Sequence, residues 1–320
     1  MAMEVQPIDI GIDVGKNELT LARSDLEGIR SIDNTPSAIS AWLRSLPGPA
    51  RLAVEATGIF HVELIERAHR AGHTVYVIDG YRLNRYREGI GGRAKTDPGD
   101  ARLLLRYLQR EANDLRPWSP PPKGYRALQQ LLLRRARLVQ AKTRLDQSLR
   151  GLPQLGPSRR SLIRHLDQLD QILIRRMRKV LLGQQWKEHA RRLQAVEGIG
   201  EITAAALVMA FHRGRFTGAD AFIAFLGLDV RVRESGSYRG RRKLTKKGAP
   251  ELRRLLYMAA MAARRSSTWE GFYRRHRDRG LSRIQSLVAL ARKLARIAFA
   301  LLKNGSEYQP RIRQEGCIAT

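Results

Sequence analysis

The sequence has almost no cysteine. Its single cysteine, Cys317, lies near the C-terminus. A disulfide needs two cysteines and a cysteine-type structural zinc centre needs at least two, so the sequence excludes an internal disulfide framework and a Cys-based zinc site. Such scarce cysteine is typical of proteins that work in a reducing cytoplasm.

Long apolar runs are also missing. The two longest, Ile202–Phe211 and Leu255–Ala263, are shorter than the roughly 20 residues that a membrane-spanning helix needs. The first residues, MAMEVQPIDI, lack the charged and apolar regions of a signal peptide. We therefore expect no membrane partner, and a location in a bacterial or archaeal cytoplasm in association with the nucleoid.

Acidic residues are few compared with basic ones. The chain has 59 Lys and Arg against 30 Asp and Glu, a formal net charge of +29. Such a chain repels itself unless a polyanion neutralises it. Arginine dominates, and its planar fork suits phosphates and base edges. The composition therefore predicts a nucleic-acid partner; the alternative is a basic surface that only keeps the protein soluble.

The first third of the chain alternates between apolar strands and helices. With 320 residues, 43% of them hydrophobic, the chain is long enough for two or three domains. Apolar alternation predicts strands over 8–13, 18–24, 29–34, 51–55 and 74–79, with helices over 37–46 and up to 71. Three meandering strands followed by alternating helix and strand is the order of the α/β ribonuclease-H-like fold.

Two acids stand at the ends of strands that this fold places side by side. Asp13 follows the apolar run Ile8–Ile12, and Glu55 ends the fourth strand. Carboxylates at neighbouring strand ends could share a divalent cation, because Mg²⁺ prefers oxygen ligands. The alternative is that each is an ordinary acid at an exposed strand end.

Two more acids open a later helix, in the stretch KTDPGDAR. We expect Asp97 at the N-cap, Pro98 at the first helical position and Asp100 in the first turn. Acids stabilise a helix start whether or not they bind anything. A helix start can nevertheless cap itself and present carboxylates, and with Asp13 and Glu55 these acids complete a candidate site for Mg²⁺, or Mn²⁺.

A basic stretch, Tyr81–Lys95, precedes this helix and is expected to be a loop. Its tyrosines Tyr81 and Tyr86 could stack on bases. Without a nucleic-acid role it is a solvated loop. The candidate nucleic-acid contacts are Arg82, Arg85, Arg87, Arg93 and Lys95.

The middle of the chain predicts long helices. The proline-rich stretch Trp118–Pro122 marks a domain boundary. One helix is expected over 125–150 and another over 158–182, where Leu162, Leu166, Leu169, Leu173, Met177 and Val180 form a coiled-coil seam. The seam could pack within one chain as a helical hairpin or between chains; we favour dimerisation.

The last third contains a Gly-x-Gly turn between two helices. Gly198 and Gly200 would let backbone N–H groups face a phosphate, as in a helix-hairpin-helix; the alternative is a plain turn. A hairpin follows over 230–240, then helices from Pro250 to about residue 302, and beyond Asn304 the lost periodicity predicts a disordered tail. The basic candidates here are Arg239, Arg241, Arg242, Lys243, Lys246 and Lys247.

Ser235 lies in the hairpin, in the sequence ESGS. Residue chemistry alone does not make it a nucleophile, because no His or Lys stands beside it in an activating pattern, and Ser-Gly is ordinary in turns. Ser237 and Tyr238 carry hydroxyls that could attack a phosphate equally well.

The motifs GIDVGK, EATG and KTDPGDA, in this order, resemble the Asp-Glu-Asp-Asp (DEDD) tetrad of transposases of insertion-sequence family 110. The later motifs GIGEITA, FLGL, ESGS and KKGAPELRRLLYMAAMAA resemble that family's C-terminal domain. The similarity covers residues 8–303. One departure is Glu197, where the family often has proline before the turn; we expect it to change only the stiffness of the turn.

The resemblance implies a fold and a chemistry. It implies a RuvC-like nuclease domain over 1–118, coiled-coil helices over 119–190, a mainly helical transposase domain over 191–304 and a tail over 305–320. The tetrad Asp13, Glu55, Asp97 and Asp100 would bind the metal. The matching serine, Ser235, would form a covalent phosphoserine with DNA.

The family is also similar in its partners. Its members join donor and target DNA, use a structured guide (bridge) RNA, and act as tetramers built from dimers. The expectation is therefore a DNA transposase-recombinase. Two alternatives stay open: a metal-dependent junction nuclease that makes no covalent adduct, and a non-catalytic nucleic-acid scaffold.

Overall fold

The computed structural model describes residues 7–56, 58–91, 96–231, 234–235, 238–240 and 242–310. The chain divides into two compact units, Met1–Pro120 and Pro121–Thr320. The division falls within the proline-rich stretch in which the sequence places a domain boundary. Each unit is described by itself.

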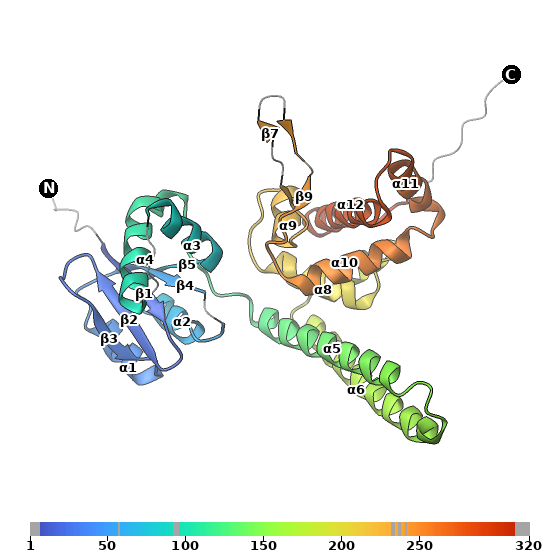
Figure 1. Ribbon diagram of the computed structural model, residues 1–320, viewed down its shortest axis with the longest axis horizontal. Helices are drawn as coiled ribbons and strands as arrows, with labels where there is room; N and C mark the ends of the chain where they lie inside the picture. The colour runs from blue at the N-terminus through green and yellow to red at the C-terminus, as the bar shows by residue number, and fades with distance from the viewer. Residues whose placement is uncertain are drawn as a thin grey trace. The chain divides into compact units, whose positions relative to one another are not determined.

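The first unit is built on a five-stranded sheet (Figure 1). Its strands are β1 (Ile8–Val14), β2 (Glu18–Arg23), β3 (Arg30–Asp33), β4 (Ala50–Glu55) and β5 (Thr74–Ile78), in the order β3-β2-β1-β4-β5. The meander β1-β2-β3 is antiparallel, whereas β4 runs parallel to β1 and β5 parallel to β4. The predicted ribonuclease-H-like, RuvC-like fold is confirmed.

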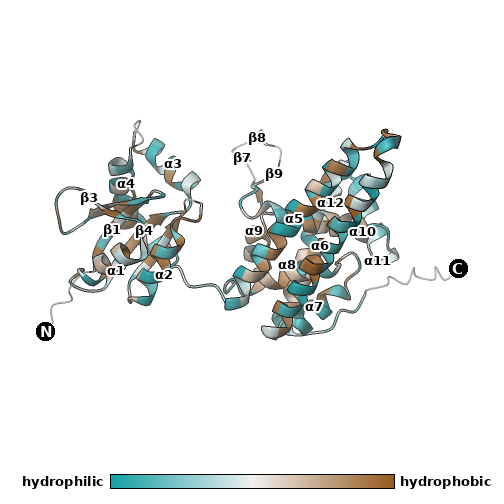
Figure 2. Ribbon diagram, turned by 90° about the horizontal axis from the view of Figure 1, so that it is seen from below, coloured by the Kyte–Doolittle hydropathy of each residue, from teal (hydrophilic) through white to brown (hydrophobic). Residues whose placement is uncertain are grey.

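Helices cover both faces of this sheet. Side chains alternate between faces along a strand, so Ile10, Ile12 and Val14 pack with α1 (Pro36–Arg44) and α2 (Val62–Arg70) on one face. The residues between them face α4 (Asp97–Glu111), which lies across β1, β2 and β4. Figure 2 shows the hydrophobic colouring of the central strands between these helices. The same alternation places Asp13 and Glu55 on the α4 face.

Gly11 allows α4 to lie directly on β1. A Cβ atom built on Gly11 would stand 2.1 Å from the carbonyl oxygen of Ala101 and 2.3 Å from the backbone nitrogen of Leu105. Both atoms belong to the α4 backbone, which cannot move aside as a flexible side chain can. Only glycine permits this contact, which brings the first turn of α4 to the end of β1.

Two local predictions in this unit were wrong. The stretch expected to be a basic loop forms the helix α3 (Gly80–Gly89), because the carboxylate of Asp79 caps it by accepting from the Arg82 amide at 3.1 Å. The N-cap of α4 is Thr96, not Asp97, since the Thr96 hydroxyl accepts from the Gly99 amide.

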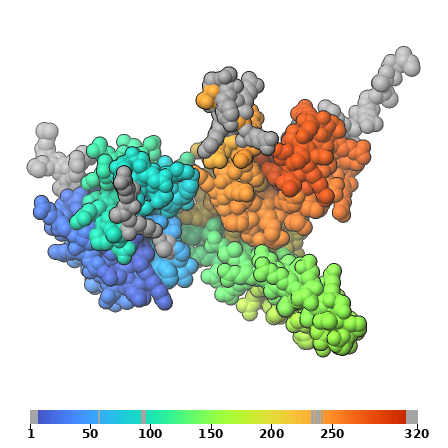
Figure 3. Space-filling model, in the orientation of Figure 1, coloured from blue at the N-terminus to red at the C-terminus, as the bar shows by residue number. Residues whose placement is uncertain are grey.

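In the second unit, two long helices form an arm (green in Figure 3). They are α5 (Lys123–Ser148) and α6 (Gly156–Gly183), joined through a short 3₁₀ turn, η2 (Pro153–Leu155). Their bases join the core of the unit, whereas ion pairs between Arg135 and Asp170 at 2.8 Å and between Asp146 and Arg159 at 2.9 Å connect them along their length. The two helices therefore form a helical hairpin within one chain, while Leu162 and Leu169 of the seam stay exposed.

Six further helices build the rest of the described part of this unit. One core runs from the base of the arm through α12, so the predicted segments 119–190 and 191–304 share a single hydrophobic core. The helices are α7 (Lys187–Gln194), α8 (Glu201–His212), α9 (Ala219–Phe225), α10 (Pro250–Ala263), α11 (Ser267–Asp278) and α12 (Arg283–Asn304).

A 3₁₀ turn, η1 (Ala112–Asp114), follows α4 in the first unit.

The start of the predicted tail is bound to the helices. Tyr308 donates a hydrogen bond from its hydroxyl to Glu197 at 3.0 Å, and the carboxylate of Glu307 accepts from Arg191 at 2.7 Å. Glu197 also accepts from Thr268 at 2.8 Å. The prediction of a disordered tail is thus wrong for residues 305–310, and Glu197 anchors this segment as well as shaping the turn.

None of the helices in the described ranges is long and apolar enough to cross a membrane.

Candidate active site

Three of the four predicted acids converge in the first unit. Carboxylate oxygens of Asp13, Glu55 and Asp100 all lie within 4.8 Å of one another. Asp13 and Glu55 come from the carboxyl ends of β1 and β4, where the last paired residues are Ile12 and Val54. Asp100 comes from the first turn of α4 and is 2% exposed. We call Asp13, Glu55 and Asp100 the acid trio.

Asp97 lies at the edge of this cluster. It is exposed, at the first residue of α4, and it is not among the acids whose oxygens converge. Its negative charge nevertheless helps to raise the pKa of Asp13. The fourth acid of the predicted tetrad is therefore close enough to act electrostatically on Asp13.

The acid trio is electrostatically unfavourable without a cation. Burial, together with the charges of Asp97, Asp100 and Glu55, raises the pKa of Asp13 to about 6. A divalent cation would remove this repulsion, and a set of carboxylate oxygens is the donor chemistry that Mg²⁺ and Mn²⁺ prefer. The residues present therefore fit a divalent metal.

Two neighbours shape the acid trio. A Cβ atom on Gly80 would stand 2.5 Å from Oε1 of Glu55, so the glycine leaves room for that carboxylate. Arg87 donates from Nη2 to Oδ1 of Asp100 at 2.6 Å, in a pair whose side chains are 11% and 3% exposed. Arg87, which the sequence analysis assigned to nucleic acid, is thus bound to an acid of the trio.

The other predicted nucleic-acid contacts have varied surroundings. Arg82 and Arg85 are exposed on α3, and Arg85 donates to the Tyr81 hydroxyl at 3.2 Å and to Glu88 at 3.0 Å. In the second unit, the exposed basic residues are Arg242, Lys243, Lys246 and Lys247. Arg93, Lys95 and Arg241 lie outside the described residues, and of Arg239 only its place in β8 is described.

Ser235 lies in the predicted hairpin of the second unit. The strands β6 (Val230–Arg231) and β9 (Lys243–Leu244) pair, as do β7 (Glu234–Ser235) and β8 (Tyr238–Arg239). Pairing thus extends past the predicted end at residue 240, to Leu244. Ser235 is exposed and lies opposite Tyr238 in the ladder, and Figure 1 shows β7 far along the hairpin from α9. Ser237 lies outside the described residues.

Close packing explains Gly198 without a phosphate. Gly198 has a φ of +91°, and a Cβ atom there would stand 2.4 Å from the carbonyl oxygen of Ala259 in α10. Gly200, at the N-cap of α8, has open space around it, but Glu201 already places a negative charge in the first turn of that helix. The turn between α7 and α8 is present, and its predicted phosphate binding stays a prediction.

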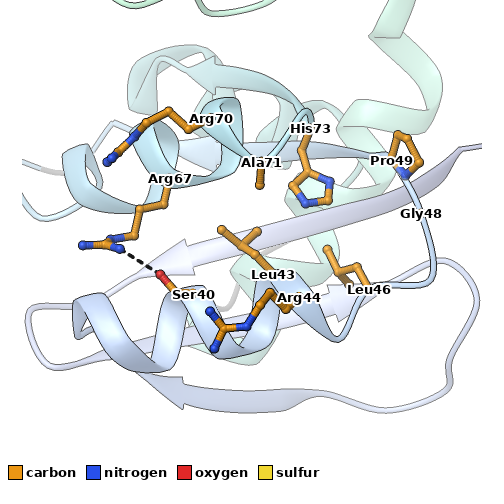
Figure 4. A pocket seen from close by; sticks show the side chains of 10 residues that line it. All are labelled: Ser40, Leu43, Arg44, Leu46, Gly48, Pro49, Arg67, Arg70, Ala71 and His73. Carbon is orange, nitrogen blue, oxygen red and sulfur yellow. Dashed lines mark hydrogen bonds between the residues drawn. The ribbon is translucent and has the colours of Figure 1, made fainter.

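One cavity of the first unit lies on the other side of the sheet from the acid trio. It has a volume of about 550 Å³ and opens between α1 and α2. Figure 4 shows its lining, including Arg44, Arg67 and Arg70, with Arg67 donating to the Ser40 hydroxyl at 2.8 Å. Because no acid lines it, this cavity is not part of the candidate metal site.

Comparison with known proteins assigns the family. A family model described as "Transposase IS116/IS110/IS902 family" matches residues 190–274, and a second, described as "Transposase" and of the IS110 DEDD type, matches residues 10–155. Between them they cover well over half of the chain. The chain belongs to this transposase family. The resemblance predicted from its motifs is confirmed.

Curated relatives agree with this assignment. The transposase chain is 26% identical to the pilin gene-inverting protein of Moraxella bovis, over 95% of this chain and 98% of the relative. It is 28% identical to a probable family 20 transposase of Pseudomonas aeruginosa, over 84% of this chain and 88% of the relative. It is a DNA transposase or recombinase, and its substrate is DNA.

A solved structure is also similar. The RuvC of T. thermophilus, in complex with a Holliday junction substrate, is 15% identical over 35% of the transposase chain and 100% of RuvC, with a TM-score of 0.28. The fold of the first unit is assigned from its own strand order.

The raised pKa of Asp13 predicts how stability depends on pH. Without metal, the cost of ionising Asp13 in the folded state is absent below the usual aspartate pKa near 4 and complete above about pH 6. Asp13→Asn removes that cost. In EDTA, we expect the variant to melt a few degrees above the wild type at about pH 7.5, and to show a smaller gain at about pH 4.

Thermal unfolding followed by circular dichroism measures this difference. Asp33→Asn, at an exposed acid of β3, is the matched control. It should change the melting temperature by about the same amount at both pH values. An equal effect of Asp13→Asn at both pH values would show that Asp13 is not under electrostatic strain.

Proposed function

We propose that the chain cleaves and rejoins DNA strands with a divalent metal held by the acid trio and a covalent phosphoserine formed at Ser235. The observation that supports this most is the convergence of Asp13, Glu55 and Asp100 in a chain of a transposase family. Three converging carboxylates attract a divalent cation, and phosphoryl transfer is a reaction that uses such a cation.

Mg²⁺, or Mn²⁺, would be held by Asp13, Glu55 and Asp100, with Asp97 next to them. When bound, such an ion stabilises negative charge on a phosphate and lowers the pKa of a hydroxyl near it. The protein's own part is to hold the carboxylates together. The close contact at Gly11 and the ion pair of Asp100 with Arg87 do this in the absence of metal.

The covalent step balances without any further reactant. The Ser235 hydroxyl oxygen forms a bond to phosphorus, one backbone P–O bond breaks, and a deoxyribose hydroxyl leaves with the proton. A hydroxyl of the second DNA then attacks the same phosphorus and frees the serine. Because the phosphodiester energy is kept in the serine ester, the strands are joined without ATP.

Exposure of Ser235 on a hairpin strand supports this role, since a nucleophile must reach a DNA backbone. The serine hydroxyl would be activated by the divalent cation that an acid trio holds.

Covalent capture tests this function. Protein is incubated with labelled DNA from the ends of its element and Mg²⁺, denatured in detergent, and examined for protein-linked DNA. We expect an adduct with the wild type, none with Ser235→Ala, and neither adduct nor cleavage with Asp13→Asn. Ser45→Ala, at an exposed serine of the first unit, is the control and should behave as wild type.

Cleavage without an adduct would instead establish the alternative, a metal-dependent junction nuclease. If both substitutions leave the protein's function unchanged, a non-catalytic nucleic-acid scaffold is favoured. The same assay after RNase treatment tests the guide RNA, which the high positive charge supports: loss of the adduct is expected, and full activity would exclude an RNA requirement.

We further propose that the arm joins two copies of the chain. In its outer half, leucines Leu145, Leu162 and Leu169 are 37–49% exposed, although they follow the apolar stripe of the helices. Such a stripe on a paired hairpin gains burial by meeting a second hairpin. A dimer, or a tetramer of two dimers, would bury this stripe.

Light scattering after size-exclusion chromatography tests the arm. Leu169→Glu should shift the protein toward the monomer, because a charge would be buried in the interface, whereas the neighbouring exposed change Gln168→Glu should not. A wild-type monomer, or an unchanged dimer in Leu169→Glu, would exclude this interface.

A further inference from the structure

A pair of exposed apolar residues follows the strand that carries Glu55 of the acid trio. Ile59 is 78% exposed and Phe60 is 37% exposed, on the loop that joins β4 to α2. Exposing this much of an isoleucine side chain to water is unfavourable. Single exposed apolar residues are ordinary on protein surfaces, so the position and anchoring of this pair decide whether it has a role.

The position is set by the chain. Ile59 follows Glu55 by four residues, and an extended chain spans at most about 3.6 Å per residue, so the two Cα atoms lie within about 14 Å. Successive bases of one strand are about 3.4 Å apart along the DNA axis. A phosphate held at the acid trio therefore has bases within reach of Ile59.

The loop is fixed to the same edge of the sheet as Asp13. The side-chain amide of Asn34 donates both to the Gly15 carbonyl at 2.9 Å and to the Phe60 carbonyl at 3.2 Å. Gly15 follows Asp13 by two residues. One asparagine thus ties the residue that follows β1 to the loop that follows β4, which constrains the place of the apolar pair relative to Asp13.

The turn that presents Ile59 is also constrained. Gly58 has a φ of +51°, in the region that favours glycine. The Val62 amide then donates to the Ile59 carbonyl at 3.2 Å, so the backbone of Ile59 is held while its side chain points away from the core. A fixed backbone with an exposed apolar side chain is what insertion into a partner requires.

We propose that Ile59 and Phe60 form an apolar wedge that enters a base step of the DNA beside the phosphate held at the acid trio. Apolar side chains inserted between bases unstack them and kink the duplex, at a cost of a few kcal/mol per step. Joining strands of two duplexes requires bases next to the break to leave their old partners. The wedge would supply that separation, and this inference depends on the proposed function.

Fluorescence of 2-aminopurine tests the wedge. The base analogue brightens when it is unstacked, and it is placed in turn at each position around the cleaved step of the element-end duplex. Ca²⁺ replaces Mg²⁺ so that the full-length protein binds without cutting. With wild type we expect a several-fold rise at one or two positions adjoining the cleaved phosphate.

The variants separate a wedge from a structural role. Ile59→Ala, at a largely exposed position, should fold normally and reduce the fluorescence rise by about threefold or more, since one inserted side chain accounts for much of an unstacked step. Ile59→Phe keeps an apolar wedge and should preserve the rise. Leu26→Ala, at an apolar residue that is 43% exposed elsewhere in the first unit, should match wild type.

Each outcome has a distinct meaning. Two outcomes would overturn the wedge and leave the proposed function intact. In the first, the wild type binds and cleaves the DNA without a fluorescence rise. In the second, Ile59→Ala and Phe60→Ala give the same fluorescence rise as the wild type. Failure of wild type to bind or cleave the duplex would overturn the proposed function, and the wedge with it.

Discussion

The contact between the backbones of β1 and α4 at Gly11 is the constraint on which the rest of the first unit depends. A side chain there would collide with the Ala101 carbonyl, and α4 would have to move away from the sheet. The buried Asp100 lies one residue before Ala101, so such a displacement would separate it from Asp13. The convergence of the carboxylates thus depends on the absence of a side chain at Gly11.

The acid trio opposes the stability of the fold that holds it. Several carboxylates in one place raise the pKa of Asp13, and only Arg87, among the described contacts of these acids, supplies a positive charge at hydrogen-bonding distance. Enzymes commonly retain such unfavourable sites because function requires them. Here the strain is electrostatic, and a bound divalent cation would relieve it.

Much of the first unit could be predicted because the relevant signals are local. Alternation of apolar residues defined all five strands, and the fold order then placed Asp13 and Glu55 at neighbouring ends. The α3 helix was missed because its composition is basic and its start depends on one cap, Asp79. The pairing of Arg87 with Asp100 was missed because it joins two helices, and no spacing within the sequence encodes it.

Two acids of one motif also proved unequal for a reason that sequence could not supply. Asp97 and Asp100 both start α4, yet the helix turns Asp100 toward β1 and leaves Asp97 exposed. Gly198 shows the opposite case, since a motif typical of phosphate binding is explained by contact with α10. Glycine spacing indicates a close approach but does not say what approaches.

Calorimetric titration with Mn²⁺ tests the metal site most directly. The wild type should bind the ion saturably, Asp100→Asn should lose this binding, and Asp97→Asn should retain a weaker form of it, because only Asp100 lies within the trio. Ser235→Ala should bind as wild type. Equal Mn²⁺ binding by wild type and Asp100→Asn would show that the acid trio does not hold the metal.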